Sequence, residues 1–189
     1  MRYEGLAFFF LSYVCVMNSS DFADKSRRRA YQKKKVLSAF LKKFTKEKPT
    51  YGKKVMKESE QVAWALIDCT SCGNCCKTMT PTWKKAEVNR LASHLGMTYN
   101  EFFEKWLMVD EETGDICNNS TPCQFFDLEK GLCGVYELRP HDCATFPHLY
   151  RSDFYDQTEL YASNLHRCPA TLTAMEHLEQ AVKEIKKKK

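Results

Sequence analysis

Residues 69–76 read CTSCGNCC, which places four cysteines within eight residues. Thiol side chains at this spacing could form disulfides, act as a redox pair, or ligate a metal as thiolates. The whole chain has ten cysteines among 189 residues, more than an intracellular protein of this length needs for packing. The chemistry of these thiols is therefore the first question that the sequence raises.

The spacing argues against disulfides and against a redox pair. Adjacent cysteines such as Cys75 and Cys76 cannot readily bridge each other without distorting the backbone, and no convincing export signal directs the chain to an oxidising compartment. An isolated C-x-x-C would suggest a redox motif. Here the motif lies among further cysteines and follows a predicted helix, whereas a redox motif opens a helix after a strand. Metal binding is the interpretation that remains.

The metal could be zinc or iron. Excluding Cys15 and Cys117, eight cysteines remain, and their thiolates would make two tetrahedral Zn²⁺ sites, whose strong negative charge needs compensation. Alternatively, the C-x2-C-x2-C spacing of Cys69, Cys72 and Cys75 is similar to the ferredoxin pattern, and Cys168 is followed by a proline, like the remote ligand of that pattern. This similarity favours an iron-sulfur cluster of the 4Fe-4S type. Four cysteines would then be left for a second centre or as buried thiols.

Two further side chains near the cysteines could take part. Arg139 lies between Cys133 and Cys143, where its guanidinium could donate hydrogen bonds to sulfurs and offset thiolate charge, or form a salt bridge that fixes the turn before a proline. We expect His148 to form hydrogen bonds without being a ligand. Cys117 lies outside the pattern, and we interpret it as a small, partly buried apolar residue.

The elements that position the cysteines are predicted to be mostly helical. We expect a small β-hairpin around Glu129-Lys130-Gly131, which would bring Cys123 and Cys133 together. Apolar spacing, caps and prolines predict the following helices: a basic amphipathic helix ending before Pro49, a helix over 53–68, a helix capped by Thr82 and stopped by Gly96, a short helix with a Thr98/Glu101 capping box, a short helix from Pro140 through Cys143, and a terminal helix from Pro169. The fold class is therefore α-rich, a single domain whose cysteine-bearing loops are organised around a metal centre.

Charge divides the chain into segments. Residues 25–57 carry fourteen Lys and Arg against one acid, whereas residues 58–185 carry ten Lys and Arg against twenty acids. We therefore predict a basic helical arm over 25–57 and a cysteine-cluster metal-binding domain over 58–189. The arm could contact nucleic acid or an anionic membrane surface, but a solvated helix that complements the acidic body is favoured.

Residues 1–24 form an apolar, irregular N-terminus. Its run from Gly5 to Met17 is too short to span a bilayer, so we expect no transmembrane segment. Its flanks lack an export cleavage site, and translation that begins at Met17 is one interpretation, with export or anchoring by residues 1–20 as another. Cys15 is not expected to take part in the site. We predict a cytoplasmic protein.

The ordered cysteines make the sequence recognisable. The succession CTSCGNCC, STPCQFFDLEKGLCGVYELRPHDCATFPH and NLHRCPAT resembles the YkgJ-type CxxCxxCC cysteine-cluster family of zinc- or iron-chelating proteins, over roughly residues 60–175. The resemblance implies that eight cysteines chelate the metal. These are Cys69, Cys72, Cys75, Cys76, Cys123, Cys133, Cys143 and Cys168.

Two alternative functions stay open at this stage. One is a redox or protein-modifying enzyme similar to the flagellin lysine-N-methylases, which share the cysteine module but carry additional sequence that this chain lacks. No Gly-rich phosphate loop or Rossmann fingerprint supports an enzyme of the nucleotide-cofactor class. The other is a nucleic-acid-binding module that uses the basic arm beside structural zinc.

Overall fold

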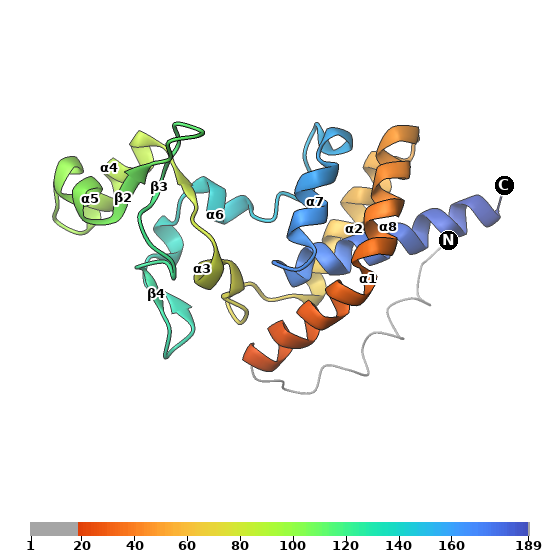
Figure 1. Cartoon of the computed structure of the whole chain (residues 1–189), viewed down its shortest axis with the longest axis horizontal. Helices are drawn as coiled ribbons and strands as arrows, with labels where there is room; N and C mark the ends of the chain where they lie inside the picture. Colours follow the sequence, from red (N-terminus) through yellow and green to blue (C-terminus); the bar gives the residue numbers. More distant parts are fainter. Residues whose placement is uncertain (1–18, 189) are drawn as a thin grey trace.

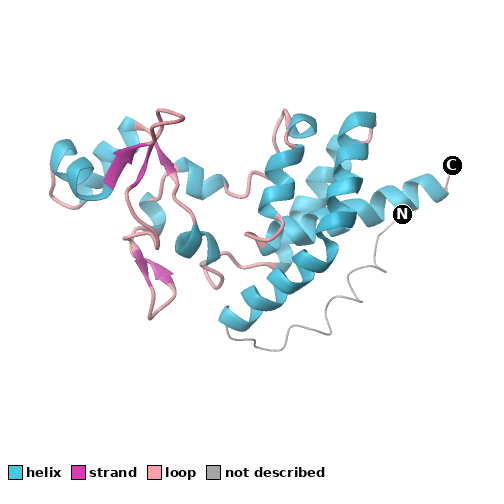
Figure 2. Ribbon diagram, in the orientation of Figure 1, coloured by secondary structure: helices cyan, strands magenta, loops and turns pink. Residues whose placement is uncertain are grey.

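The computed structural model describes residues 19–188. The predictions for residues 1–18 of the apolar N-terminus, for a start at Met17 and for Cys15 lie outside these residues, whereas residues 19–24 are helical. The described chain folds into two lobes, a helical lobe and a smaller lobe that holds the β-strands (Figures 1 and 2). Each lobe has its own cluster of buried apolar side chains.

The helical lobe contains α1 (Ser19–Glu47), α2 (Gly52–Leu66), α7 (Thr158–Asn164) and α8 (Pro169–Lys187). The apolar side chains at helical spacing, such as Leu37, Leu41 and Phe44 of α1, are buried against α7 and α8. The lysines of α1 remain exposed on the other side of the helix. A short 3₁₀ helix, η3 (Phe154–Asp156), packs against α1.

The smaller lobe combines short helices with two small antiparallel sheets. Strands β1 (Thr82–Trp83), β3 (Ile116–Asn118) and β2 (Leu107–Val109) form one sheet in that order, and β4 (Phe126–Asp127) pairs with β5 (Leu132–Cys133) in the other. The helices are α3 (Asn74–Thr78), α4 (Lys85–His94), α5 (Tyr99–Trp106), α6 (His141–Thr145) and the 3₁₀ helix η2 (Tyr136–Leu138). The core of this lobe packs aromatic rings, among them Trp83 and Phe102, whose centroids are 6.0 Å apart.

The α-rich fold class with a small hairpin is confirmed. The hairpin forms where the Glu129-Lys130-Gly131 turn predicts it, with Phe126 opposite Cys133. The capping box is also present: the Thr98 hydroxyl accepts a hydrogen bond from the Glu101 N–H, and the Glu101 carboxylate accepts one from the Thr98 N–H at 2.7 Å. It holds the start of α5 as the sequence predicts.

The prediction that Thr82 caps a helix is wrong. Thr82 lies in β1, paired with Cys117 of β3, and α4 begins three residues later, at Lys85. The Glu87 carboxylate accepts the Lys84 N–H at 2.8 Å and satisfies the start of that helix instead. The three-stranded sheet around β3 is an addition to the predicted fold.

No helix among residues 19–188 combines the length and the apolar character that crossing a bilayer requires.

Candidate metal centre

The cysteines gather where the two lobes meet, around two adjoining cavities. The larger cavity, of about 90 Å³, has six cysteines in its wall, and the smaller, of about 20 Å³, has four. Cys69 and Cys75 line both cavities, whereas Cys72 and Cys168 line the smaller one alone. The four cysteines that line the larger cavity alone are Cys76, Cys123, Cys133 and Cys143. The fold therefore brings all eight predicted ligands to one region.

The CTSCGNCC run forms a turn and a short helix that lead the chain from α2 into the smaller lobe. Gly73 precedes α3 with a φ of 60°, a left-handed conformation that glycine adopts without strain. A Cβ at this position would lie 2.4 Å from the Phe126 ring, so the absence of a side chain also allows the β4 strand to approach. The buried Asn74 donates a hydrogen bond from its side-chain amide to the Arg167 carbonyl at 2.6 Å, which places the run beside Cys168.

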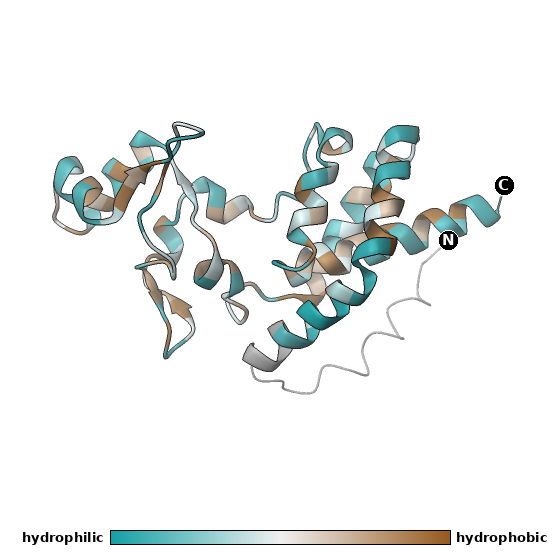
Figure 3. Cartoon of the chain, in the orientation of Figure 1, coloured by the Kyte–Doolittle hydropathy of each residue, from teal (hydrophilic) through white to brown (hydrophobic). Residues whose placement is uncertain are grey.

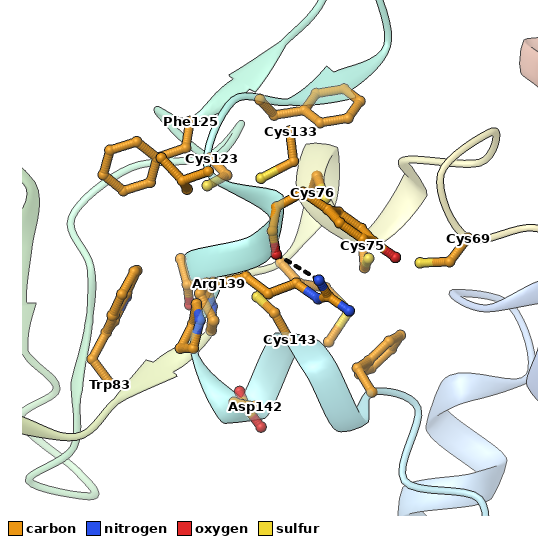
Figure 4. Close-up of a pocket in the computed structure, with 18 residues that line it drawn as sticks. Cys69, Cys75, Cys76, Trp83, Cys123, Phe125, Cys133, Arg139, Asp142 and Cys143 are labelled. Carbon is orange, nitrogen blue, oxygen red and sulfur yellow. Dashed lines mark hydrogen bonds between the residues drawn. The ribbon is translucent and has the colours of Figure 1, made fainter. Parts of the chain in front are cut away.

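The remaining cysteines come from separate elements. The Cys123 N–H donates to the Cys76 carbonyl at 2.8 Å and joins the start of the hairpin segment to α3. Cys133 lies in β5, Cys143 in α6, and Cys168 is the residue before α8. Figure 4 shows the larger cavity, with Cys123 and Cys133 on one side of Cys76 and Cys143 on the other.

Four of the eight sulfurs accept a hydrogen bond from the backbone N–H two residues further along the chain. The donors are the N–H groups of Asn74, Phe125, Val135 and Ala170, and Cys168 also accepts from the Thr171 N–H. Each bond lowers the pKa of the thiol that accepts it, against the raising effect of burial. Such bonds stabilise a sulfur that carries negative charge. The acceptors are Cys72, Cys123, Cys133 and Cys168.

Burial is the largest influence on most of these thiols because it disfavours the charged form. It raises the pKa of Cys143 to about 12 and that of Cys168 to about 11, with neighbouring cysteines adding to the rise. Cys75 and Cys76 differ, since a hydrogen bond between their side chains raises the pKa of Cys75 and lowers that of Cys76. Of these two adjacent thiols, Cys76 therefore loses its proton first and Cys75 keeps its own.

Arg139 is the basic residue in the wall of the larger cavity. Its guanidinium lies 3.7 Å from the centroid of the Tyr136 ring and donates to the Tyr136 carbonyl, a bond drawn in Figure 4. Its charge acts to lower the pKa of both Cys69 and Cys133, against the raising effect of burial. Lys77 acts in the same direction on the pKa of Cys72 and Cys76. Positive charge therefore reaches the cysteines of both cavities.

Asn118 is a polar residue at the site that the sequence does not predict. Its side chain is 2% exposed, and its oxygen accepts the Trp83 indole N–H at 2.8 Å. The Asn118 side chain acts to lower the pKa of Cys123, and its Nδ2 has no hydrogen-bond partner among residues 19–188. A buried donor that has no partner and acts on a nearby thiol fits a sulfur that carries negative charge. No local motif marks Asn118, because Trp83, which donates to its side chain, lies 35 residues earlier in the sequence.

His148 forms hydrogen bonds, as expected. Its Nε2 lies 3.2 Å from the Asp142 carboxylate and its Nδ1 lies 3.1 Å from the Thr145 hydroxyl. The Asp142 carboxylate also accepts the Thr82 N–H at 2.9 Å, and both interactions lower the pKa of Asp142. Phe146 lines both cysteine cavities and also a wider groove of about 860 Å³ that contains His148. These contacts fix the α6 segment that carries Cys143.

Cys117 lies apart from the site. It is in the middle of β3, opposite Thr82 on one side and Met108 on the other, and lines neither cysteine cavity. The nine cysteines of the described chain are free thiols. Among residues 19–188, no three His, Cys, Asp or Glu side chains stand close enough together to hold one metal ion.

The fold gathers thiols around two cavities, together with backbone N–H groups and basic side chains that favour the thiolate form. These are the ligands and the surroundings expected of a metal-chelating protein. The model of the CxxCxxCC family, described as "Putative zinc- or iron-chelating domain", matches residues 68–169. The match covers more than half of the 189 residues, and the chain belongs to this family. No curated protein and no solved structure matches the chain.

Proposed function

We propose that the protein binds metal at two centres, each held by four cysteines. The first set comprises Cys69, Cys72, Cys75 and Cys168. The second set comprises Cys76, Cys123, Cys133 and Cys143.

The division of the eight cysteines between the two cavities carries this proposal. Six of the eight line only one of the two cavities. Cys72 and Cys168 line only the smaller cavity, whereas the four cysteines of the second set line only the larger one. Cys69 and Cys75 line both cavities. We assign them to the smaller cavity, where they make a set of four with Cys72 and Cys168. Within the second set, Cys143 is affected electrostatically by all three of the other members. Cys76 also affects Cys69, Cys72 and Cys75, so the two sets lie side by side and the division rests on the cavities alone. Cys168 is affected in the same way by Cys72.

The spacing of the first set supports an iron-sulfur cluster there. Its C-x2-C-x2-C run with a remote Cys-Pro is the arrangement of ligands in ferredoxin clusters. The second set draws its ligands from separate segments of the chain, an arrangement that suits either a tetrahedral zinc or a second cluster. When bound, a cluster would supply one-electron transfer, whereas zinc would supply a structural cross-link.

The residues around the thiols fit this role. Backbone N–H groups, Arg139 and Lys77 all favour the thiolate form, which is the form that binds metal. Because no three ligand side chains of the described chain stand within reach of one ion, metal binding requires the cysteine side chains to turn toward one another. Binding would thereby tighten the junction between the lobes. Free thiols with this chemistry suit a reducing compartment such as the cytoplasm.

Anaerobic purification, elemental analysis and an absorption spectrum test the proposal. Iron with acid-labile sulfide and a broad visible band is the result expected for a cluster at the first set. Cys72→Ser should remove that band, whereas Cys117→Ser, a matched change outside both cavities, should keep it. Colourless protein with zinc at both sets would contradict an iron-sulfur cluster but would support two metal centres. Protein that binds neither metal, or equal losses from the two substitutions, would overturn the proposal.

A further inference from the structure

The end of α1, the start of α2 that follows it after a short loop, and the end of α8 all lie on the side of the helical lobe that faces away from the cysteines (Figure 1). The end of α1 meets the end of α8 through an ion pair between Glu47 and Lys186, whose atoms are 2.9 Å apart. The start of α2 lies nearby as well, since Tyr51, the residue before α2, acts electrostatically on Lys186. We call residues 42–57 and 183–188 the lysine end.

The lysine end is strongly basic. Its two ranges contain eleven lysines, no arginine, and two acids, Glu47 and Glu184. Every one of these lysines is exposed. Four of them form ion pairs, namely Lys43, Lys48, Lys183 and Lys186. The other seven have no ion pair within the described part of the chain. Figure 3 shows hydrophilic bands that alternate with hydrophobic ones along the last turns of α1 and α8.

Helix stability alone does not account for this distribution. Lysines at the ends of α1 and α8 suit the negative pole of each helix. Lys53 and Lys54, however, lie in the first turn of α2, at its positive pole, and that turn contains no acid. These two charges oppose both the helix dipole and the neighbouring lysines. A polyanionic partner would relieve this repulsion.

We propose that the lysine end binds the phosphodiester backbone of nucleic acid without preference for sequence. Lysine is a point charge that neutralises phosphates, whereas reading of bases relies on the forked donors of arginine or on side-chain amides. An anionic membrane is the less suitable partner, because surface-bound helices insert apolar side chains into the bilayer. None of the exposed large hydrophobic residues of the described chain falls within the lysine end.

The test uses the full chain, purified with its metal, and two short DNA duplexes of unrelated sequence. Fluorescence anisotropy would measure the Kd of each between about 50 and 200 mM salt. The two duplexes should bind alike, and affinity should fall steeply with salt. A triple variant changes Lys46, Lys53 and Lys54 to Gln. In this variant the negative slope of log K for binding against log salt should become shallower, by about 0.9 for each phosphate that is no longer neutralised.

A matched variant separates the lysine end from the rest of α1. Arg28, Lys34 and Lys35 are also exposed on α1 but lie outside the lysine end, and their change to Gln removes the same charge. This variant should keep the wild-type slope. Metal content should be unchanged in both variants, which separates this proposal from the metal centres. A slope reduced only in the second variant, or a strong preference for one duplex, would overturn the proposal. Binding to phosphatidylserine vesicles without binding to DNA would also overturn it.

Discussion

The side-chain amide of Asn74 donates a hydrogen bond to the backbone carbonyl of Arg167, 2.6 Å away, across 93 residues of sequence. This bond ties the CTSCGNCC run of the smaller lobe to the residue before Cys168, at the start of α8. It therefore sets the distance between cysteines of the first set that come from different lobes.

Asn74→Ala should weaken metal binding at the first set. The substitution leaves the Arg167 carbonyl without its donor, and we expect a loss of about 1–3 kcal/mol in the free energy of unfolding. Chemical denaturation and metal analysis measure the two effects. Asn89→Ala removes an exposed amide from α4 and should change neither. Unchanged metal content in the Asn74 variant would show that this bond does not position Cys168.

Gly73→Ala should disturb the second set through the hairpin. The new Cβ would meet the Phe126 ring at 2.4 Å, in addition to the strain of a left-handed backbone. Gly96 has a similar φ of 69° but open space around it, so Gly96→Ala carries the strain without the clash. We expect the Gly73 variant to lose more stability than the Gly96 variant, and to lose metal as well. Equal unfolding midpoints for the two variants would contradict the packing described for Phe126.

Arg139→Met should lower metal affinity at both centres. The change keeps much of the side-chain volume but removes the charge that lowers the pKa of Cys69 and Cys133, one from each set. We expect a loss of about 10-fold or more in affinity, measured by competition with a chelator. Arg90→Met is the control, since Arg90 contacts the same chain segment through the Leu138 carbonyl but does not line the cavity. Equal losses in the two variants would indicate general loosening of that segment.

Metal affinity should rise with pH. Burial raises the pKa of Cys143 to about 12 and that of Cys168 to about 11, so both thiols are protonated at neutral pH when no metal is bound. Each must release a proton to become a ligand, and binding therefore weakens as the pH falls. The apparent affinity should change by up to about tenfold per pH unit for each such thiol. Chelator competition across neutral pH measures the slope, and a flat profile would contradict thiolate ligation.

The sequence predicts the elements whose signals are local. The Thr98/Glu101 pair lies within one helical turn, and the hairpin turn at residues 129–131 lies between two short apolar runs. The three-stranded sheet has strands of only two or three residues, too short to show the alternation by which strands are predicted. The helical pattern of α4 therefore extends, in the prediction, back to Thr82, although the helix itself begins later.

That eight cysteines belong together could be predicted, but how they are divided between the two cavities could not. Cys75 and Cys76 are adjacent in sequence, and only the fold separates Cys76, which lines the larger cavity alone, from Cys75, which lines both. The contacts of Asn118 and the Asp142–His148 pair likewise depend on tertiary structure. The enzymatic alternative stays a prediction, as does the division of the chain at residue 57.

The most direct test of the two-centre proposal is the metal content of Cys168→Ser compared with Cys143→Ser, each purified anaerobically beside the wild type and Cys117→Ser. Each of the first two variants should lose one centre and keep the other, and Cys117→Ser should keep both. Loss of all metal from both variants, with the fold retained by circular dichroism, would contradict two separate centres and indicate a single shared one.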